Sequence, residues 1–390
     1  MSTFFSKNKK VVRKFCIVTT SPLIVEFFLI PHLKRLVDLF EVTLIANEDC
    51  SNLLERENLG QVRMINIPIK REISVRSDFM AFLNLSFFFI RERFDAVVTV
   101  APKAGLIGIF AAFVSQRPFR CHIFQGEVWA LKHGIMRWVL KSADRLVAYF
   151  ATHILVVSSS ERDFLIGEGI LSRKKSQVLG SGSICGVNGH IFRSNPLIRT
   201  QIRSKYDIPD HALLILYLGR VKRDKGVVDI VRAWIELVHK HPELHLAIVG
   251  PDEDNLSEQI RRMANLGVVD RLHIQGRTLE PQAWIAAADI LSLPSYREGF
   301  GMVLIEAGSA GLPVVASRIY GISDAMIEGV TGLSYPPGNL EELASCLEKL
   351  IENPALRHQL GNAGKERVIK EFGQDVVVSR YIEFWDSLIK

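Results

Sequence analysis

The amino-acid sequence predicts an α/β protein with two doubly wound, Rossmann-like parallel-sheet domains that face each other across a cleft. Three observations support this prediction. At 390 residues the chain is too long for one typical core and fits two domains. Short apolar runs alternate with helix-like stretches in both halves, which is typical of parallel sheets. A loop-rich segment, 181–204, interrupts the alternation near the middle.

The apolar runs define two series of strands. The first domain, 1–190, has expected strands at 11–20, 41–46, 62–67, 96–100, 122–124, 154–157 and 177–180. The second domain, 191–374, has expected strands at 213–219, 244–250, 272–274, 290–293 and 313–316. The last segment, 375–390, carries apolar residues on one helical face, and we expect this helix to cross back to the first domain.

Composition excludes several classes of protein. The five cysteines are scattered without a CxxC pair, which favours reduced thiols over a disulfide framework or a metal cluster. The basic start, Met1 to Lys14, lacks the long apolar core of a signal peptide. The longest apolar run, Phe79 to Ile90, is shorter than the roughly 20 residues of a spanning helix. We therefore expect a cytoplasmic protein without a transmembrane helix.

Charge is unevenly distributed along the chain. Residues 1–190 contain 25 Lys and Arg against 16 Asp and Glu, a net charge of +9. Residues 191–390 contain 23 against 26, a net charge of −3. The basic half indicates an anionic partner on one side of the molecule, for which nucleic acid, an anionic membrane surface and a phosphorylated substrate all remain candidates.

The stretch 294–308 reads as a glycine loop between a buried strand and a helix. A helix start presents free amide N–H groups and the positive end of the helix dipole, so it attracts phosphate. Glu298 and Glu306 flank this start, and carboxylates are good acceptors for sugar hydroxyls. The pattern therefore predicts a site for a phosphate flanked by sugars.

A cation-rich turn opens the second domain. Gly219-Arg220-Val221-Lys222-Arg223-Asp224-Lys225-Gly226 follows an apolar strand and precedes a helix. Arg220 can bind phosphate oxygens through its guanidinium fork, and Lys225 adds a point charge. A solvated basic turn is the alternative, and the phosphate-type helix start in the same domain favours binding.

Several motifs together resemble the retaining glycosyltransferases of glycosyltransferase family 4, which have the GT-B fold. The resemblance rests on Gly219-Arg220-x4-Lys225-Gly226, Glu298-Gly299-Phe300-Gly301-x4-Glu306-Ala307 and Gly311-x-Pro313-Val314-Val315, and it runs along nearly the whole chain. It extends to Pro102-Lys103-Ala104-Gly105, Val156-Val157-Ser158 and Gly321-Ile322-Ser323-Asp324.

The resemblance implies a role for each donor-side residue. Arg220 and Lys225 would bind the diphosphate of a nucleotide-sugar, and Glu298 would face the transferred sugar and stabilise its oxocarbenium charge. Glu306 would accept hydrogen bonds from the ribose. The other implied donor contacts are the amides of Phe300, Gly301, Met302 and Val303, the loop glycines Gly219 and Gly299, and Arg277 and Thr278 at the nucleobase.

The acceptor side departs from the family pattern. Gln125 stands where many members have a histidine, so we name Gln125, Glu127 and Lys103 as the acceptor-side candidates. His122 is expected to be a core histidine. Asp252-Glu253-Asp254 spells a DxD motif, but it lies where this family has a glycine turn, so we expect no metal ion and no cofactor.

Two segments, Trp129 to Lys141 and Phe79 to Arg93, mix aromatic, aliphatic and basic residues at helical spacing. Such helices lie on anionic membranes, although a core-facing helix with a basic edge gives the same pattern. Bacterial members that resemble this chain often extend a sugar on undecaprenyl diphosphate. We therefore expect a peripheral protein on the inner face of the cytoplasmic membrane that transfers an N-acetylhexosamine, such as N-acetylgalactosamine from its UDP-sugar, to a lipid-linked saccharide of a surface polysaccharide or O-antigen.

Other functions remain as alternatives. A nucleotide-sugar epimerase or a glycosyl phosphorylase could use a similar scaffold. A dinucleotide oxidoreductase is disfavoured because no GxGxxG motif follows a candidate first strand. A nucleic-acid-binding module could use the basic half, which however lacks a helix-turn-helix or zinc signature, so we expect no nucleic-acid partner.

Overall fold

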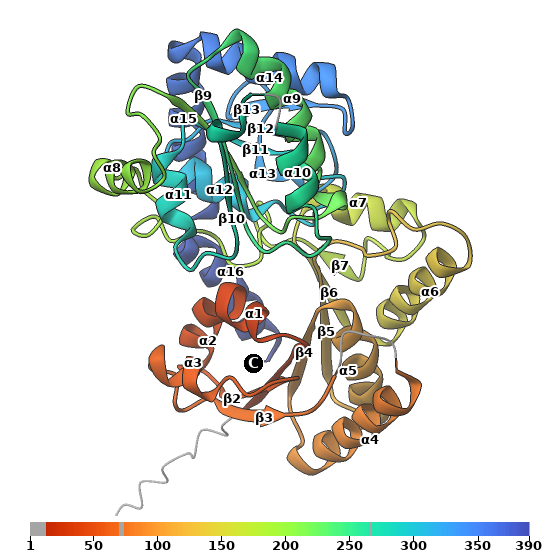
Figure 1. Cartoon of the computed structure of the whole chain (residues 1–390). Coiled ribbons are helices and arrows are strands. Elements are labelled where there is room, and N and C mark those ends of the chain that lie inside the picture. Colours follow the sequence, from red (N-terminus) through yellow and green to blue (C-terminus); the bar gives the residue numbers. More distant parts are fainter. Residues whose placement is uncertain (1–12, 70–73, 265–266, 390) are drawn as a thin grey trace, which may run out of the picture.

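The structure is a computed structural model, and it describes residues 13–69, 74–264 and 267–389. The expectation for Met1 to Lys14 therefore falls largely outside the described residues. The chain forms two parallel sheets, of which the first lies in the lower part and the second in the upper part of Figure 1. The predicted fold class, two Rossmann-like domains, is confirmed.

The first sheet contains seven strands in the order β3-β2-β1-β4-β5-β6-β7. Their bounds are Lys14–Val18 (β1), Glu41–Ala46 (β2), Arg63–Asn66 (β3), Ala96–Val100 (β4), Phe119–Phe124 (β5), His153–Val156 (β6) and Ser176–Gln177 (β7). The central strands are buried on both faces, which explains why they read as continuous apolar runs.

Helices cover both faces of this sheet. Pro22–Ile24 (α1), the π-helical turn Val25–Leu29, Ile30–Leu36 (α2) and Ser51–Arg56 (α3) lie on one side, and Val75–Glu92 (α4), Pro102–Val114 (α5) and Gly134–Phe150 (α6) lie on the other (Figure 1). Helix α5 packs between α4 and α6. Ser159–Gly167 (α7) connects β6 to β7.

The second sheet contains six strands in the order β10-β9-β8-β11-β12-β13. Their bounds are Leu213–Leu218 (β8), Leu244–Val249 (β9), Leu272–Gln275 (β10), Ile290–Leu293 (β11), Val314–Ser317 (β12) and Gly332–Tyr335 (β13). The edge strand β13 was not among the expected strands. Its four residues start with glycine and include a serine and a partly exposed leucine, so it lacks the buried aliphatic run of its neighbours.

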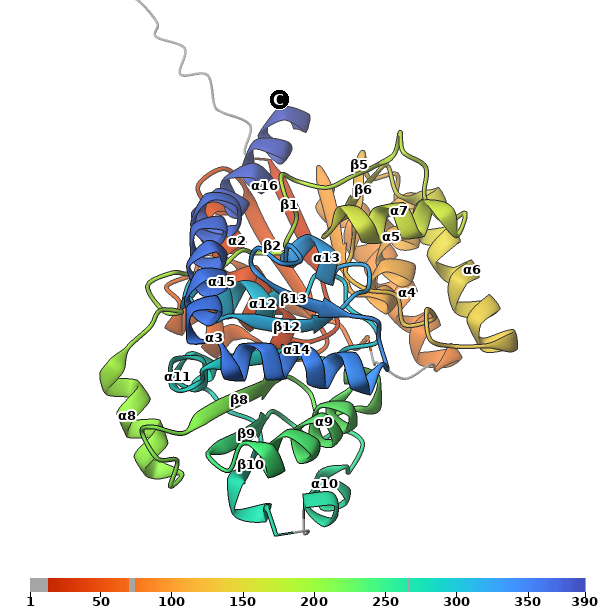
Figure 2. The same ribbon diagram turned by 90° about the horizontal axis from the view of Figure 1, so that it is seen from above.

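Nine α-helices complete the described part of the chain beyond β7. They are Pro196–Lys205 (α8), Val227–Lys240 (α9), Ser257–Ala264 (α10), Pro281–Ala287 (α11), Met302–Ser309 (α12), Ile322–Ala325 (α13), Leu340–Glu352 (α14), Pro354–Arg367 (α15) and Gln374–Leu388 (α16). Helix α16 runs from the second domain down to the first, where it packs on α2 (Figures 1 and 2). Its Trp385 is fully buried against Phe15 of β1, with ring centroids 4.9 Å apart.

The expected amphipathic helix at Trp129 to Lys141 is shorter at its start. Helix α6 begins at Gly134, and Trp129 precedes it as a buried residue whose indole nitrogen donates to Asp144 at 2.6 Å. Interpreting Trp129 as part of a membrane-facing surface was therefore wrong. The exposed aromatic residue of this segment is Trp138.

Candidate active site

The candidate site lies at the edge of the second sheet where the strand order reverses. The chain leaves β8 toward β9 on one side, and β11 lies on the other side of β8. Crevices at such switch points, outside the carboxyl ends of the strands, are the usual ligand sites of doubly wound sheets. The loops that follow β8 and β11 are the cation-rich turn 219–226 and the glycine loop 294–301.

These two loops are packed directly against each other. Lys225 Nζ lies 2.6 Å from Glu298 Oε1 and donates to the carbonyl of Arg297 at 3.0 Å. The hydroxyl of Ser295 donates to the same carboxylate oxygen at 2.8 Å. A Cβ on Gly226 would lie 2.0 Å from the carbonyl oxygen of Pro294, so only glycine permits this approach. Lys225 and Glu298 are thus held as one unit.

Arg220 lies in the same turn and pairs with Glu253 at 3.2 Å. Glu253 is the middle residue of the DxD motif. The other two carboxylates of the motif accept hydrogen bonds from backbone amides of the protein. Asp252 accepts from the amides of Leu256 and Ser257 at the start of α10, and Asp254 accepts from the amide of Arg223. The motif therefore holds the neighbouring loops in place, and the absence of a metal requirement stays a prediction.

Helix α12 begins with amide groups that have no partner. In the described residues, the N–H groups from Phe300 to Val303 donate to no protein acceptor. Gly301 has φ of +70°, a left-handed conformation that glycine tolerates best and that turns the chain into the helix. Such a row of amides at a helix N-terminus suits a phosphate.

Glu306 lies one turn further along α12. It is half-buried, and desolvation by the surrounding protein raises its pKa to about 7. Within the described part of the chain no charged partner offsets this cost. A desolvated carboxylate kept without such a partner beside the open helix start is consistent with one that accepts hydrogen bonds from a ligand.

Arg277 and Thr278 follow β10 at the same edge of the sheet. Arg277 is exposed, and its guanidinium lies 3.8 Å from Glu26, a residue of the π-helical turn in the first domain. The hydroxyl of Thr278 accepts from the amide of Glu280. Their contact with a nucleobase stays a prediction, and the structure adds an ion pair between the domains.

The acceptor-side candidates occupy different places. Lys103 lies in the first turn of α5, at the switch point between β1 and β4, and pairs with Asp78 at 2.7 Å. Gln125 follows β5 and touches the glycine loop, because a Cβ on Gly299 would lie 2.5 Å from the carbonyl carbon of Gln125. His122 is buried and lies 2.8 Å from the hydroxyl of Thr99, as expected for a core histidine.

Glu127 is in a buried cluster of acids. It is 2% exposed, and burial raises its pKa to about 7. Burial and the neighbouring Glu127 raise the pKa of Glu161 well above its usual range, and one oxygen of Glu161 accepts from the amide of Gly126. Burial also raises the pKa of Asp144 to about 6. Glu127 thus shares a desolvated environment with other acids, and Glu161 binds the loop that carries Gln125.

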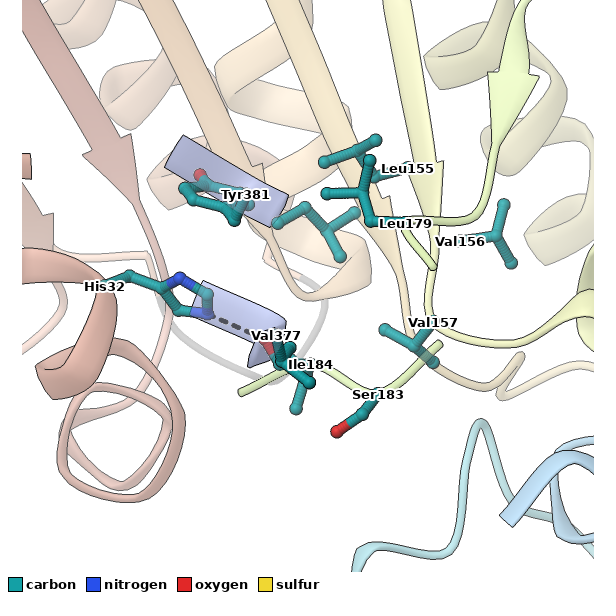
Figure 3. Close-up of a pocket in the computed structure, with 10 residues that line it drawn as sticks. His32, Leu155, Val156, Val157, Leu179, Ser183, Ile184, Val377 and Tyr381 are labelled. Carbon is teal, nitrogen blue, oxygen red and sulfur yellow. Dashed lines mark hydrogen bonds between the residues drawn. The ribbon is translucent and has the colours of Figure 1, made fainter. Parts of the chain in front are cut away.

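A small cavity lies between the first domain and α16, and it is not the candidate site. It has a volume of about 30 Å³, far below the few hundred Å³ of a ligand pocket. Figure 3 shows His32 of α2 and Tyr381 of α16 at its wall, with His32 Nε2 2.7 Å from the carbonyl oxygen of Ile184. Burial lowers the pKa of His32 to about 4, so the ring is neutral and donates through Nε2.

Several residues lie within the motifs quoted above, but the sequence did not indicate that their side chains hold the site. Ser295 supports Glu298, Asp224 pairs with Arg297 at 3.2 Å, and Asp324 binds the start of α7. Ser158-x-x-Glu161 has the spacing of a helix capping box, a signal that predicts local structure only.

Two facing parallel α/β domains, with a cation-rich loop and an open helix start at one switch point, have the architecture of the GT-B fold. Residues 198–367 match the family model "Glycosyl transferases group 1", and residues 32–182 match "Glycosyl transferase 4-like domain". The chain is a glycosyltransferase of the GT-B fold, and each of its halves matches one of these two models.

Individual relatives agree with this assignment. The chain is 29% identical over 329 residues, 83% of this chain and 85% of the relative, to the capsular polysaccharide biosynthesis glycosyltransferase CapM of Staphylococcus aureus. It is 31% identical over 262 residues, 65% of this chain and 53% of the relative, to a D-inositol 3-phosphate glycosyltransferase of Streptomyces avermitilis. The structure of Anabaena Alr3699/HepE with UDP and glucose superimposes with a TM-score of 0.81 at 18% identity, covering 96% of this chain and all of that one.

The buried acids predict a specific pH dependence of stability. The folded-state pKa of Glu127, about 7, exceeds its usual value of 4.5. The folded protein therefore binds more protons than the unfolded one between these values, and stability falls as pH rises from about 4.5 to about 7. Glu127→Gln removes this ionisation. We expect the variant to gain stability relative to the parent on going from pH 5 to pH 8, on the order of 1.4 kcal/mol for each pKa unit of the shift.

Urea unfolding followed by tryptophan fluorescence at both pH values measures this gain. Glu280→Gln is the matched control, because Glu280 is exposed and the difference from the parent should not change with pH. An equal difference for Glu127→Gln at pH 5 and pH 8 would contradict a buried, protonated Glu127.

Proposed function

We propose that the protein is a retaining glycosyltransferase that moves a sugar from a nucleotide-sugar to a lipid-linked saccharide. The donor that we propose is a UDP-sugar. The observation that carries the proposal is the joined unit of Lys225 and Glu298 beside the open amide row from Phe300 to Val303. Cations and amides suit a diphosphate, and the carboxylate suits the sugar attached to it.

The chemistry follows from where charge develops. As the bond between the anomeric carbon and the diphosphate oxygen breaks, its electron pair stays on the diphosphate and the sugar gains oxocarbenium character. Lys225, Arg220 and the start of α12 stabilise the departing charge more strongly than the ground state. Glu298 stabilises the positive sugar. The acceptor hydroxyl bonds to the same face, where its proton can pass to the departing diphosphate oxygen.

The nucleotide part of the donor fits the remaining groups. Glu306 accepts hydrogen bonds from the ribose, and the backbone at Arg277 and Thr278 meets the base. Neutralisation of the diphosphate by two side-chain cations makes a metal ion unnecessary in this scheme. The HepE structure is a complex with UDP and glucose, which supports UDP as the first choice of nucleotide, and N-acetylgalactosamine remains our choice of sugar.

Two similar proteins, both named for the synthesis of surface polysaccharides, support our proposal of a lipid-linked acceptor. The relative CapM is named for capsular polysaccharide biosynthesis. The structure of WaaG, a glycosyltransferase involved in lipopolysaccharide biosynthesis, superimposes with a TM-score of 0.72 at 20% identity, covering 96% of this chain and 99% of that one. In the described residues no helix is both long and apolar enough to cross a bilayer. We propose peripheral contact with the inner face of the cytoplasmic membrane.

The first domain carries a surface that fits an anionic bilayer. Helices α4, α5 and α6 expose large apolar side chains: Val75, Phe79, Met80, Phe87, Ile90, Phe110, Phe113, Ile135, Met136 and Trp138. The exposed charges on these helices, Arg76, Arg91 and Arg145, are all basic. Their acids are turned inward, because Asp78 pairs with Lys103, Glu92 with Lys14, and Asp144 with Trp129. Apolar and basic groups together bind anionic lipid surfaces.

A donor panel tests the proposed activity. The protein is incubated with UDP-, GDP- and dTDP-sugars and with short-chain polyprenyl-diphosphate saccharides, and products are read by mass. We expect one UDP-N-acetylhexosamine to extend a lipid-linked acceptor. A glycosyl phosphate or an epimerised donor would instead indicate a phosphorylase or an epimerase. No turnover or hydrolysis of any donor contradicts the proposal.

Lys225→Ala and Glu298→Gln test the joined unit. Each removes a charge that faces the developing charges of the reaction, so we expect turnover to fall by roughly 100-fold or more. Lys240→Ala and Glu348→Gln are matched controls, since these residues form an ion pair between the end of α9 and α14, away from both loops of the site. Circular dichroism and thermal unfolding confirm that each variant is folded. Full activity in either site variant excludes its role.

Flotation with lipid vesicles tests the membrane surface. We expect the protein to float with phosphatidylglycerol vesicles and less with phosphatidylcholine, and Trp138→Glu to lose most of this binding because it places a charge in the apolar surface. Leu197→Glu is the matched control on the second domain, where Leu197 is 77% exposed. Unchanged flotation of Trp138→Glu would show that this surface does not contact the bilayer.

A further inference from the structure

The start of helix α7 belongs to the first domain but is bound by a side chain of the second. The carboxylate of Asp324, on α13, accepts from the amides of Ser159 at 3.0 Å and Ser160 at 3.1 Å. The hydroxyl of Ser160 also donates to Asp324, and it accepts from the amide of Gly321 at 2.7 Å. A carboxylate at a helix N-terminus binds free amides and the positive end of the dipole. Figure 1 shows α7 reaching up to the second domain.

Ser158, at the N-cap of α7, contacts the glycine loop. It is fully buried, accepts from the amide of Glu161, and donates to the carbonyl oxygen of Gly299 at 2.8 Å. A peptide group is planar, and its C=O and N–H point in opposite directions. Holding the carbonyl of Gly299 therefore fixes the direction of the next amide, that of Phe300. This is the first of the unpaired amides at the start of α12.

The two domains meet here backbone to backbone. A Cβ on Gly299 would lie 2.5 Å from Gln125 C, and a Cβ on Gly321 would lie 2.6 Å from the carbonyl oxygens of Glu298 and Gly299. The glycine loop is thus enclosed by a loop of each domain. Separating the domains would break the bonds of Ser158 and Asp324 and would release the peptide of Gly299.

We propose that Ser158, Ser160 and Asp324 are positioning residues, named here the closure clasp, that hold the first domain on the glycine loop and aim the amide of Phe300 at the donor. The clasp rests on the proposed function, since it acts through the donor-binding loop. Its loss leaves Arg220, Lys225 and Glu306 in place, so the donor still binds. Transition-state stabilisation falls because the amide is no longer pre-oriented.

Kinetics separate this role from a merely structural one. For Ser158→Ala and Asp324→Asn we expect kcat to fall by about 10- to 100-fold, whereas the dissociation constant of UDP measured by calorimetry changes by less than about 3-fold. Ser160→Ala should behave likewise, and Ser160→Thr, which retains the hydroxyl, should restore activity. Asp163→Asn on α7 and Ser323→Ala beside Asp324 are the controls, because both side chains are exposed and outside the clasp. Unchanged kcat in Ser158→Ala and Asp324→Asn overturns the proposal.

A second measurement does not depend on turnover. Hydrogen exchange in the peptides that contain Ser159, Ser160 and Gly321 should be faster in Asp324→Asn than in the parent, and small-angle scattering should give a larger radius of gyration. If no donor is turned over by the parent, the proposed function fails while this test of the clasp remains. Equal exchange and equal size in the parent and Asp324→Asn exclude the clasp, even where Ser158→Ala does not fold.

Discussion

The geometry of the site depends on the contact of three backbones at Gly299. Gln125 of the first domain and Gly321 of the second both approach so tightly that a single added carbon would collide. Such a contact cannot be adjusted by side-chain rotation, so the loop position depends directly on the relative position of the domains. The residues beside Gly299, Glu298 and Phe300, are those that would meet the sugar and the phosphate. A change in the arrangement of the two domains would therefore move the residues that we propose contact the donor.

The charges around this loop are arranged in ion pairs within the protein. Lys225 is held by Glu298, Arg220 by Glu253 and Arg297 by Asp224. A diphosphate must compete with these carboxylates, which lowers the net gain from each cation in the ground state. The same pairs keep the cations near their working positions, so little reorganisation remains when charge develops on the leaving group. In the proposed reaction this arrangement would favour catalysis over tight binding of the nucleotide.

Much of this was predictable from the sequence, for physical reasons. Buried parallel strands read as apolar runs, and the loops after β8 and β11 carry glycine and charge in a short stretch of chain. Sequence spacing is therefore sufficient for the fold and for placing Lys225 and Glu298 in one site, whereas the ion pair between them is seen only in the structure. The contacts of Ser158 with Gly299 and of Ser160 with Asp324 join residues more than 140 positions apart, and no local pattern encodes them. Glu127 was named as a polar residue near the acceptor, but its burial beside Glu161 depends on the tertiary fold.

The buried acids are costly, and their position explains why they can be retained. Glu161 accepts from the amide of Gly126, next to Gln125, so the acid cluster fixes the loop that meets Gly299. An apolar replacement would leave that amide without an acceptor in the protein interior, which also costs free energy. Burial raises the pKa of both carboxyls, which lowers the negative charge near Glu298, and Glu161 still accepts from that amide. The basic, apolar surface of α4 to α6 belongs to the same domain as this loop, so a lipid-linked acceptor bound there would reach the sugar from the side that the loop defines.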